Sequence, residues 1–172
     1  MIVTERGMAG PGGVPKDVDR EVVAFFAEMN VTDSWCYREN IRRRTDLPVD
    51  SATAQPEFET TNLMESVNGY VYGNMPVVTL RQGERVRWYM FAGVNRLDHH
   101  AVHRHGQPAT VRGRQTQVME LGPMMMGVAD MVPQNPGTWL LHCREEDHFE
   151  AGMAARYEVL PAEKTASTGP EE

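Results

Sequence analysis

The sequence predicts an all-β domain, folded as a sandwich or a barrel. Short apolar runs recur at close spacing between turn signals over most of the chain after residue 60, and few stretches have a helical period. A chain of 172 residues suits one such domain and leaves no room for two well-formed cores. With 41% hydrophobic and 24% charged residues, the composition is that of a folded globular domain rather than a disordered tail.

The expected strands are β-branched or aromatic runs that end at Gly, Pro, Asn or Ser. Residues 85–91 alternate imperfectly between polar and apolar side chains, as a strand with one buried face should. In chain order, the expected strands are residues 21–29, 68–72, 77–80, 85–91, 98–105, 116–121, 138–143 and 154–160.

The segments outside these strands suggest how the chain is organised. Residues 1–19 are rich in Gly, Pro and charge and are expected to form an arm or linker before a domain of residues 20–160. Within that domain, the polar residues 31–60 are expected to form a short turn or helix anchored by Trp35 and Ile41. The polar residues 161–172 are expected to form a flexible tail.

Charge and hydropathy exclude two classes of partner. A net charge of −7 argues against nonspecific nucleic-acid binding, because few cations are available to neutralise phosphates. No run approaches the roughly 18 apolar residues that a membrane span needs. The N-terminus also lacks the apolar core of a secretory signal, so the chain is expected to be cytoplasmic or to have lost a leader, and its compartment stays unassigned.

The histidines are unevenly distributed. All six fall within one 50-residue window, and three of them, His100, His103 and His105, lie in one expected strand. Because residues two apart on a strand share a face, His103 and His105 point one way and His100 the other. The strand can therefore serve two sites at once, although a set of polar residues on a solvent face gives the same pattern.

A second motif makes a metal site the better interpretation. Cys143 is followed five residues later by His148 and ten residues later by Met153. With His100 from the earlier strand, they supply a thiolate, two imidazoles and a weak axial thioether, the ligand set of a blue-copper site. Taken alone, Cys143 or Met153 would be an ordinary core residue.

These segments resemble a known family. His-x-x-His-x-His-Gly at 100–106 and His-Cys-x4-His-x4-Met at 142–153 are similar to the copper motifs of the multicopper oxidases, especially the ceruloplasmin-like branch. The resemblance covers residues 14–160 and includes Asp33-Ser34-Trp35 and the stretches 16–21, 66–70 and 132–139. It implies one plastocyanin-like domain with the cupredoxin fold, a Greek-key β-sandwich, and makes the arm similar to an interdomain linker.

The resemblance also implies roles for the motif residues. His100, Cys143, His148 and Met153 match the ligands of type 1 copper, whereas His103, His105 and His142 match positions facing a type 2/type 3 copper cluster. A full cluster in that family takes eight histidines from two facing domains, and this chain offers three. Arg144 stands where an oxygen-reducing member has another cluster histidine, and a guanidinium offers a metal no lone pair.

Two functions remain open from the sequence. One is single-electron transfer through type 1 copper, with a redox partner protein or a small reductant. The other is a copper oxidoreductase, similar to a multicopper oxidase or a nitrite reductase, whose second copper lies at the interface of a homotrimer or of another partner chain. A cupredoxin domain that has lost its metal is the non-catalytic alternative, and Cys36 has no assigned role.

The surface loops add one further expectation. The acidic run Glu145, Glu146, Asp147 lies between two of the expected copper ligands. It either steers a cationic partner by long-range attraction or forms a solvated loop.

Overall fold

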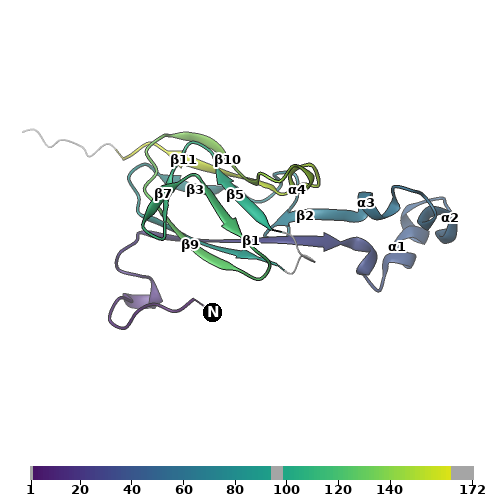
Figure 1. The fold of residues 1–172 in the computed structure, drawn as a ribbon, viewed down its shortest axis with the longest axis horizontal. Coiled ribbons are helices and arrows are strands. Elements are labelled where there is room, and N and C mark those ends of the chain that lie inside the picture. The colour runs from purple at the N-terminus through teal and green to yellow at the C-terminus, as the bar shows by residue number, and fades with distance from the viewer. Residues whose placement is uncertain (1, 94–98, 164–172) are drawn as a thin grey trace, which may run out of the picture.

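A computed structural model describes residues 2–93 and 99–163. Two β-sheets pack face to face and enclose the core (Figure 1). In this part of the chain one sheet has the strand order β2-β1-β4-β9-β6-β7 and the other the order β3-β11-β10-β5-β8. The strands are β1 (Arg20–Asn30), β2 (Leu63–Val67), β3 (Val78–Arg81), β4 (Val86–Ala92), β5 (His100–Arg104), β6 (Ala109–Val111), β7 (Arg114–Thr116), β8 (Val118–Leu121), β9 (Met126–Met131), β10 (Gly137–Cys143) and β11 (Ala154–Leu160).

The core forms where the inward side chains of both sheets meet. Strand β4 alternates between buried and half-buried residues along its whole length, as its sequence predicts, and Trp88 and Met90 are fully enclosed. From the other sheet, Leu141 and Tyr157 pack into the same cluster, and the Tyr157 and Trp88 rings meet edge to face with centroids 5.9 Å apart. The predicted all-β sandwich is therefore confirmed.

The chain crosses repeatedly between the sheets. The expected strand at residues 116–121 divides in two: Thr116 ends β7 in the six-stranded sheet, and Val118 begins β8 in the five-stranded sheet. The Thr116 hydroxyl accepts a hydrogen bond from the amide of Val118 and donates one to its carbonyl, which closes the turn between them. After β8 the chain returns through β9 to the six-stranded sheet and then through β10 to the five-stranded sheet.

Residues 31–62 form a helical excursion that extends beyond one end of the sandwich (Figure 1). It contains the 3₁₀ helix η2 (Val31–Asp33) and the α-helices α1 (Tyr37–Arg44), α2 (Val49–Thr53) and α3 (Phe58–Asn62). The expectation that Trp35 anchors this segment is wrong, because its side chain is fully exposed. Ile41 is half-buried and lines a cavity of about 180 Å³ with Tyr37 and Phe58.

The strand expected at residues 68–72 is also wrong. The strand here is β2, which ends at Val67, and Asn68, Gly69 and Tyr72 have the positive φ angles of turns. The side chain of Asn68 accepts a hydrogen bond from the Phe25 amide and so holds the turn against β1. A side-chain amide that bonds to backbone stabilises a turn, and the apolar residues around it gave a false strand signal.

The N-terminal segment is attached to the sandwich by charge and burial. It contains the 3₁₀ helix η1 (Pro11–Gly13), after which Val18 is buried. Asp17 pairs with Arg87 at 2.9 Å and Asp19 with Arg85 at 2.6 Å. The division into arm, domain and tail remains a prediction, and residues 164–172 and Asp98 lie outside the described residues. No helix in the described ranges has the length and apolar character to span a membrane.

Candidate metal centre

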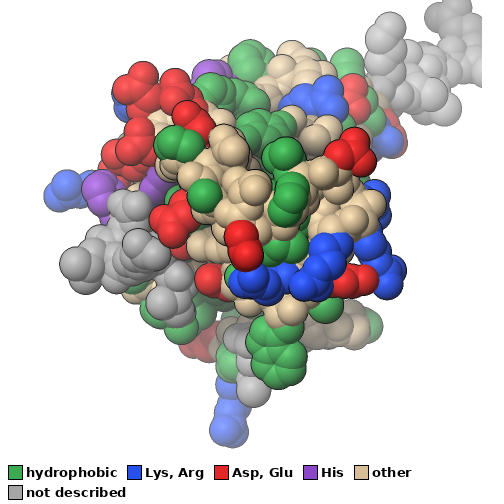
Figure 2. All heavy atoms as spheres, turned by 90° about the vertical axis from the view of Figure 1, so that its right-hand side faces the viewer, with side chains coloured by type: hydrophobic (Ala, Val, Ile, Leu, Met, Phe, Trp, Pro, Cys, Tyr) green, Lys and Arg blue, Asp and Glu red, His purple; other side chains and the backbone are tan. Residues whose placement is uncertain are grey.

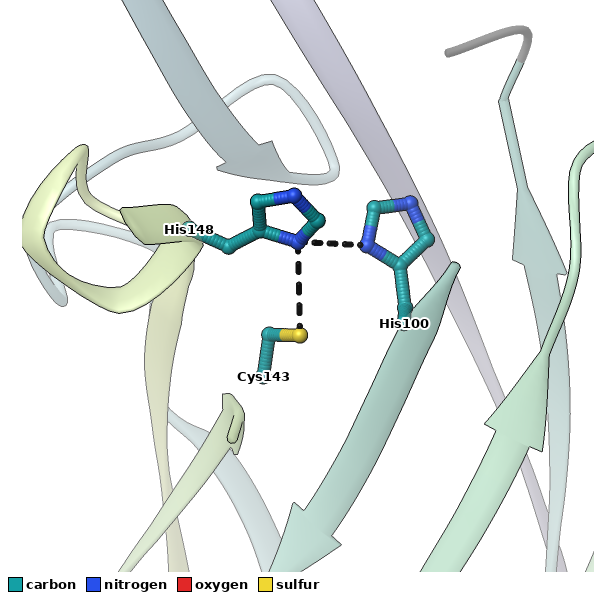
Figure 3. A group of neighbouring side chains, drawn as sticks. All are labelled: His100, Cys143 and His148. Atoms are coloured by element: carbon teal, nitrogen blue, oxygen red, sulfur yellow. Dashed lines mark hydrogen bonds between the residues drawn. The ribbon is translucent and has the colours of Figure 1, made fainter. Parts of the chain in front are cut away.

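His100, Cys143 and His148 form a buried cluster, here called the inner cluster. Their ligand atoms all lie within 4.8 Å of one another. The Nδ1 atoms of His100 and His148 are 3.2 Å apart, and Cys143 Sγ is 3.5 Å from His148 Nδ1. Figure 3 shows the Nδ1 atom of His148 facing both the Cys143 sulfur and the Nδ1 atom of His100. Two imidazoles and a thiol that face one point form a donor set that suits a thiophilic transition metal.

The pairing of β10 with β5 positions this cluster. In the antiparallel register, Cys143 lies opposite Val102 and His142 lies opposite His103. Cys143 and Val102 point into the core, so His100, two residues from Val102, points inward as well. The neighbours of Cys143 and Val102 on these strands, His142 and His103, therefore point outward.

The loop between β10 and β11 supplies the third inner residue. His148 lies in α4 (Glu146–Glu150), and the Met153 amide donates to the His148 carbonyl at 2.9 Å. The Cys143 amide donates in turn to the Met153 carbonyl at 3.2 Å. The buried Met153, which the sequence predicts as a weak axial ligand, is therefore tied through its backbone to two inner-cluster residues.

Gly152 allows the loop to fold this tightly. Its φ is +109°, a conformation that L side chains rarely adopt, and its carbonyl accepts a hydrogen bond from the Tyr72 amide at 2.8 Å. A Cβ at this position would lie 2.9 Å from the Val71 Cβ and 3.2 Å from the Tyr72 ring. The turn at residues 70–73 and the ligand loop thus approach as closely as their backbones permit.

The second group of histidines, here called the outer triad, lies on the opposite face of the same two strands. His103, His105 and His142 are half-buried, and their ligand atoms also lie within 4.8 Å of one another. The Nε2 atoms of His105 and His142 are 2.9 Å apart, and the His103 and His105 ring centroids are 4.4 Å apart. Three imidazoles at this spacing can bind one metal ion.

Burial and nearby charge favour the neutral forms of His103 and His142 in the outer triad. Burial is the main cause that lowers the pKa of both imidazoles, and electrostatic interaction with His105 and Arg144 lowers it further. Hydrogen bonds partly oppose this effect: Gln117 raises the pKa of His103 and the Cys143 backbone raises that of His142. A neutral imidazole keeps a lone pair for a metal, so the local electrostatics favour the ligand-competent form.

Some residues around the site were not predicted as part of it. Phe26 packs on the His100 ring and Phe149 on the His142 ring, with centroids 6.1 and 5.1 Å apart. Arg104 is fully buried, and its burial lowers its pKa to about 10. Strand alternation could have identified Arg104, because it shares the inward parity of His100 and Val102.

His99 and Cys36 belong to neither cluster. His99 Nε2 is 3.4 Å from a Glu145 carboxylate oxygen. Cys36 is exposed at the start of α1, in the helical excursion, and Cys143 is buried in the inner cluster. Both cysteines are free thiols.

The comparisons with known proteins agree with this geometry. Residues 42–163 match the family model described as multicopper oxidase. Human hephaestin is 35% identical over 161 residues, which cover 92% of this chain and 14% of hephaestin. Mouse ceruloplasmin is 35% identical over 149 residues, which cover 87% of this chain and 14% of ceruloplasmin. The chain therefore belongs to the multicopper oxidase family and spans about 14% of the length of these curated relatives.

Solved structures support the fold. A multicopper oxidase crystal structure matches with a TM-score of 0.59 at 20% identity, covering 86% of this chain and 46% of that one. A metallo-oxidase from Campylobacter jejuni matches with a TM-score of 0.57 at 12% identity, covering 87% and 31%. The sandwich is the one typical of cupredoxin domains in this family, which confirms the cupredoxin prediction.

Substitution of Gly152 tests whether the ligand loop depends on its backbone conformation. We expect Gly152→Ala to destabilise the fold by at least about 1 kcal/mol more than Gly83→Ala, because steric overlap adds to backbone strain. Gly83 is the matched control, with a φ of +83° and open space around its Cβ position. Denaturant unfolding of the metal-free variants measures both losses. Equal losses would show that the contact with Val71 and Tyr72 does not constrain the loop.

Proposed function

We propose that this chain is a copper redox protein that transfers single electrons at a type 1 site made by His100, Cys143, His148 and Met153. The observation that supports this best is the convergence of two Nδ1 atoms and one Sγ in a buried space. Copper fits this donor set because thiolate favours Cu(I) and imidazole suits both oxidation states. When bound, copper would supply reversible one-electron chemistry.

The protein's part in this function is to hold the ligands still. All three inner-cluster side chains are buried, and Phe26 packs on one of the rings. The loop bearing His148 and Met153 is fixed by backbone hydrogen bonds to β10 and to Tyr72. A rigid set of ligands that excludes water would keep the same arrangement in both oxidation states of a bound copper. This would lower the reorganisation energy of electron transfer.

The surface around α4 carries acidic side chains that would attract a cationic partner. Glu146 and Asp147 begin the helix that contains His148, and the exposed Phe149 ring lies beside His142. Figure 2 views the helical end of the molecule, where several Asp and Glu side chains gather at the upper left and a row of Lys and Arg side chains lies at the lower right. Such an acidic region next to an apolar ring would attract a basic redox partner toward the buried site.

Replacing the thiolate tests the type 1 assignment. Cu(II) added to the metal-free protein should give an intense visible absorption band, and Cys143→Ser should abolish it, because the band arises from charge transfer at the cysteine sulfur. Met153→Leu is the control: it should keep the band and change the reduction potential, since a weak axial ligand mainly tunes the potential. An unchanged band in Cys143→Ser would contradict the assignment.

The outer triad favours a second candidate function, a copper oxidoreductase. His103, His105 and His142 would hold a second metal, and the peptide unit between His142 and Cys143 would join the two sites covalently. The triad lies on a half-exposed face, where another chain could approach it. We propose a homotrimer as the assembly, because the family resemblance implies domains arranged around a threefold axis, and a heterologous contact with that rotation closes into a ring of three.

The copper content separates the two functions. One copper per chain is expected for an electron carrier, whereas two per chain, with an axial type 2 signal in electron paramagnetic resonance, are expected for the oxidoreductase. In the second case the double variant His105→Ala, His142→Ala should lose one copper and keep the visible band. Light scattering on the same samples should give three times the chain mass, and a monomer with unchanged copper in the double variant would contradict both the trimer and the second site.

A further inference from the structure

A cation directly follows β10, beside the outer triad. Continuing the alternation of β10 by one residue past Cys143 places Arg144 on the same side as His142. The Arg144 amide donates to the Ala101 carbonyl of β5 at 2.9 Å, which continues the register of the two strands by one more residue. Its side chain is exposed and acts electrostatically on both His103 and His142.

This guanidinium is not neutralised within the described ranges 2–93 and 99–163. No carboxylate there lies within 4.0 Å of the Arg144 side chain. The next residue along the chain, Glu145, directs its carboxylate to His99 instead, at 3.4 Å. The positive charge beside the triad is therefore a local feature of a protein whose net charge is −7.

The chemistry of the triad, like the charge of Arg144, favours an anionic ligand. Neutral imidazoles do not offset the charge of a metal ion that they bind, so a metal-loaded triad beside Arg144 would be strongly cationic. A guanidinium presents parallel N–H groups that match the two oxygens of a planar oxyanion. An arginine cannot replace a histidine ligand, but it can bind the anion that such a site attracts.

We propose that Arg144 is the anion-binding residue of the outer triad, and that the site takes a small planar oxyanion or a carboxylate. This inference deepens the second candidate function and rests on the triad being its binding site. Arg144 thereby determines the class of ligand at this site. A histidine in its place would add a further metal ligand, whereas the arginine adds a group that binds an anion.

Titration with formate, a redox-inert carboxylate, tests the inference. Formate is added to the metal-free and the zinc-loaded protein while the Arg144 Nε–H and Ala101 amide resonances are followed by nuclear magnetic resonance. Saturable shifts are expected in both forms, with tighter binding in the zinc-loaded form. Arg144→Gln should weaken formate binding by about tenfold or more, the effect of losing one charge-assisted hydrogen-bond pair.

Two controls define the outcome. Arg144→Lys should be intermediate, because it keeps the charge and loses the planar fork, and Arg114→Gln, an exposed arginine in the other sheet, should bind formate like the parent protein. Equal formate affinity in the parent and in Arg144→Gln, or shifts that do not saturate, would overturn the inference.

The same samples distinguish this inference from the second candidate function. If zinc binds equally well to the His105→Ala, His142→Ala variant, the triad is not a metal site and that function fails, while the metal-free titration still decides the role of Arg144. Light scattering identifies the source of the anion. A mass that falls as formate is added means that a carboxylate of a neighbouring chain occupies the site, and a constant mass means that a free anion does.

Discussion

The antiparallel pairing of β10 with β5 is the constraint on which both histidine clusters depend. Because side chains alternate along a strand, one register places Cys143 and His100 in the core and leaves His142 and His103 on the opposite face. Slipping the register by a single residue would exchange the two faces and destroy both clusters at once. The inner and outer groups are therefore two consequences of one strand pair.

Burial makes the polar side chains of the inner cluster costly for the stability of the fold. Polar side chains in a dry interior are costly unless they gain partners, and His100, Cys143 and His148 sit together at a depth where only 0 to 5% of each is exposed. Arg104 adds a charge to the same interior, where its guanidinium contacts the Thr116 carbonyl, at 3.4 Å, and the Met90 sulfur, at 3.7 Å. Burial lowers its pKa to about 10, so it stays protonated at neutral pH. A core that retains such groups accepts a loss of stability, which a bound metal at the inner cluster would offset.

The residues of both clusters could be predicted from the sequence because the signals that mark them are local motifs, although the strand pairing that joins them is not. Strand alternation at residues 98–105 separates His100 from His103 and His105, and the spacing of Cys143, His148 and Met153 identifies a loop that folds back on its own strand. Elements whose structure depends on distant partners were harder to predict. The prediction of a strand at residues 68–72 was wrong because the Asn68 side chain forms a hydrogen bond with the β1 backbone, which stabilises a turn. Trp35 was wrong as an anchor because the helical excursion leaves the sandwich, and hydrophobicity alone does not indicate what a side chain packs against.

The proposed function depends on copper binding to the Cys143 sulfur in the buried His–Cys–His cluster. X-ray absorption at the copper edge, on protein loaded with one equivalent of copper, measures the ligands directly. We expect one close sulfur scatterer together with two imidazole nitrogens. A copper environment of nitrogen and oxygen alone, with no sulfur scatterer, would contradict it.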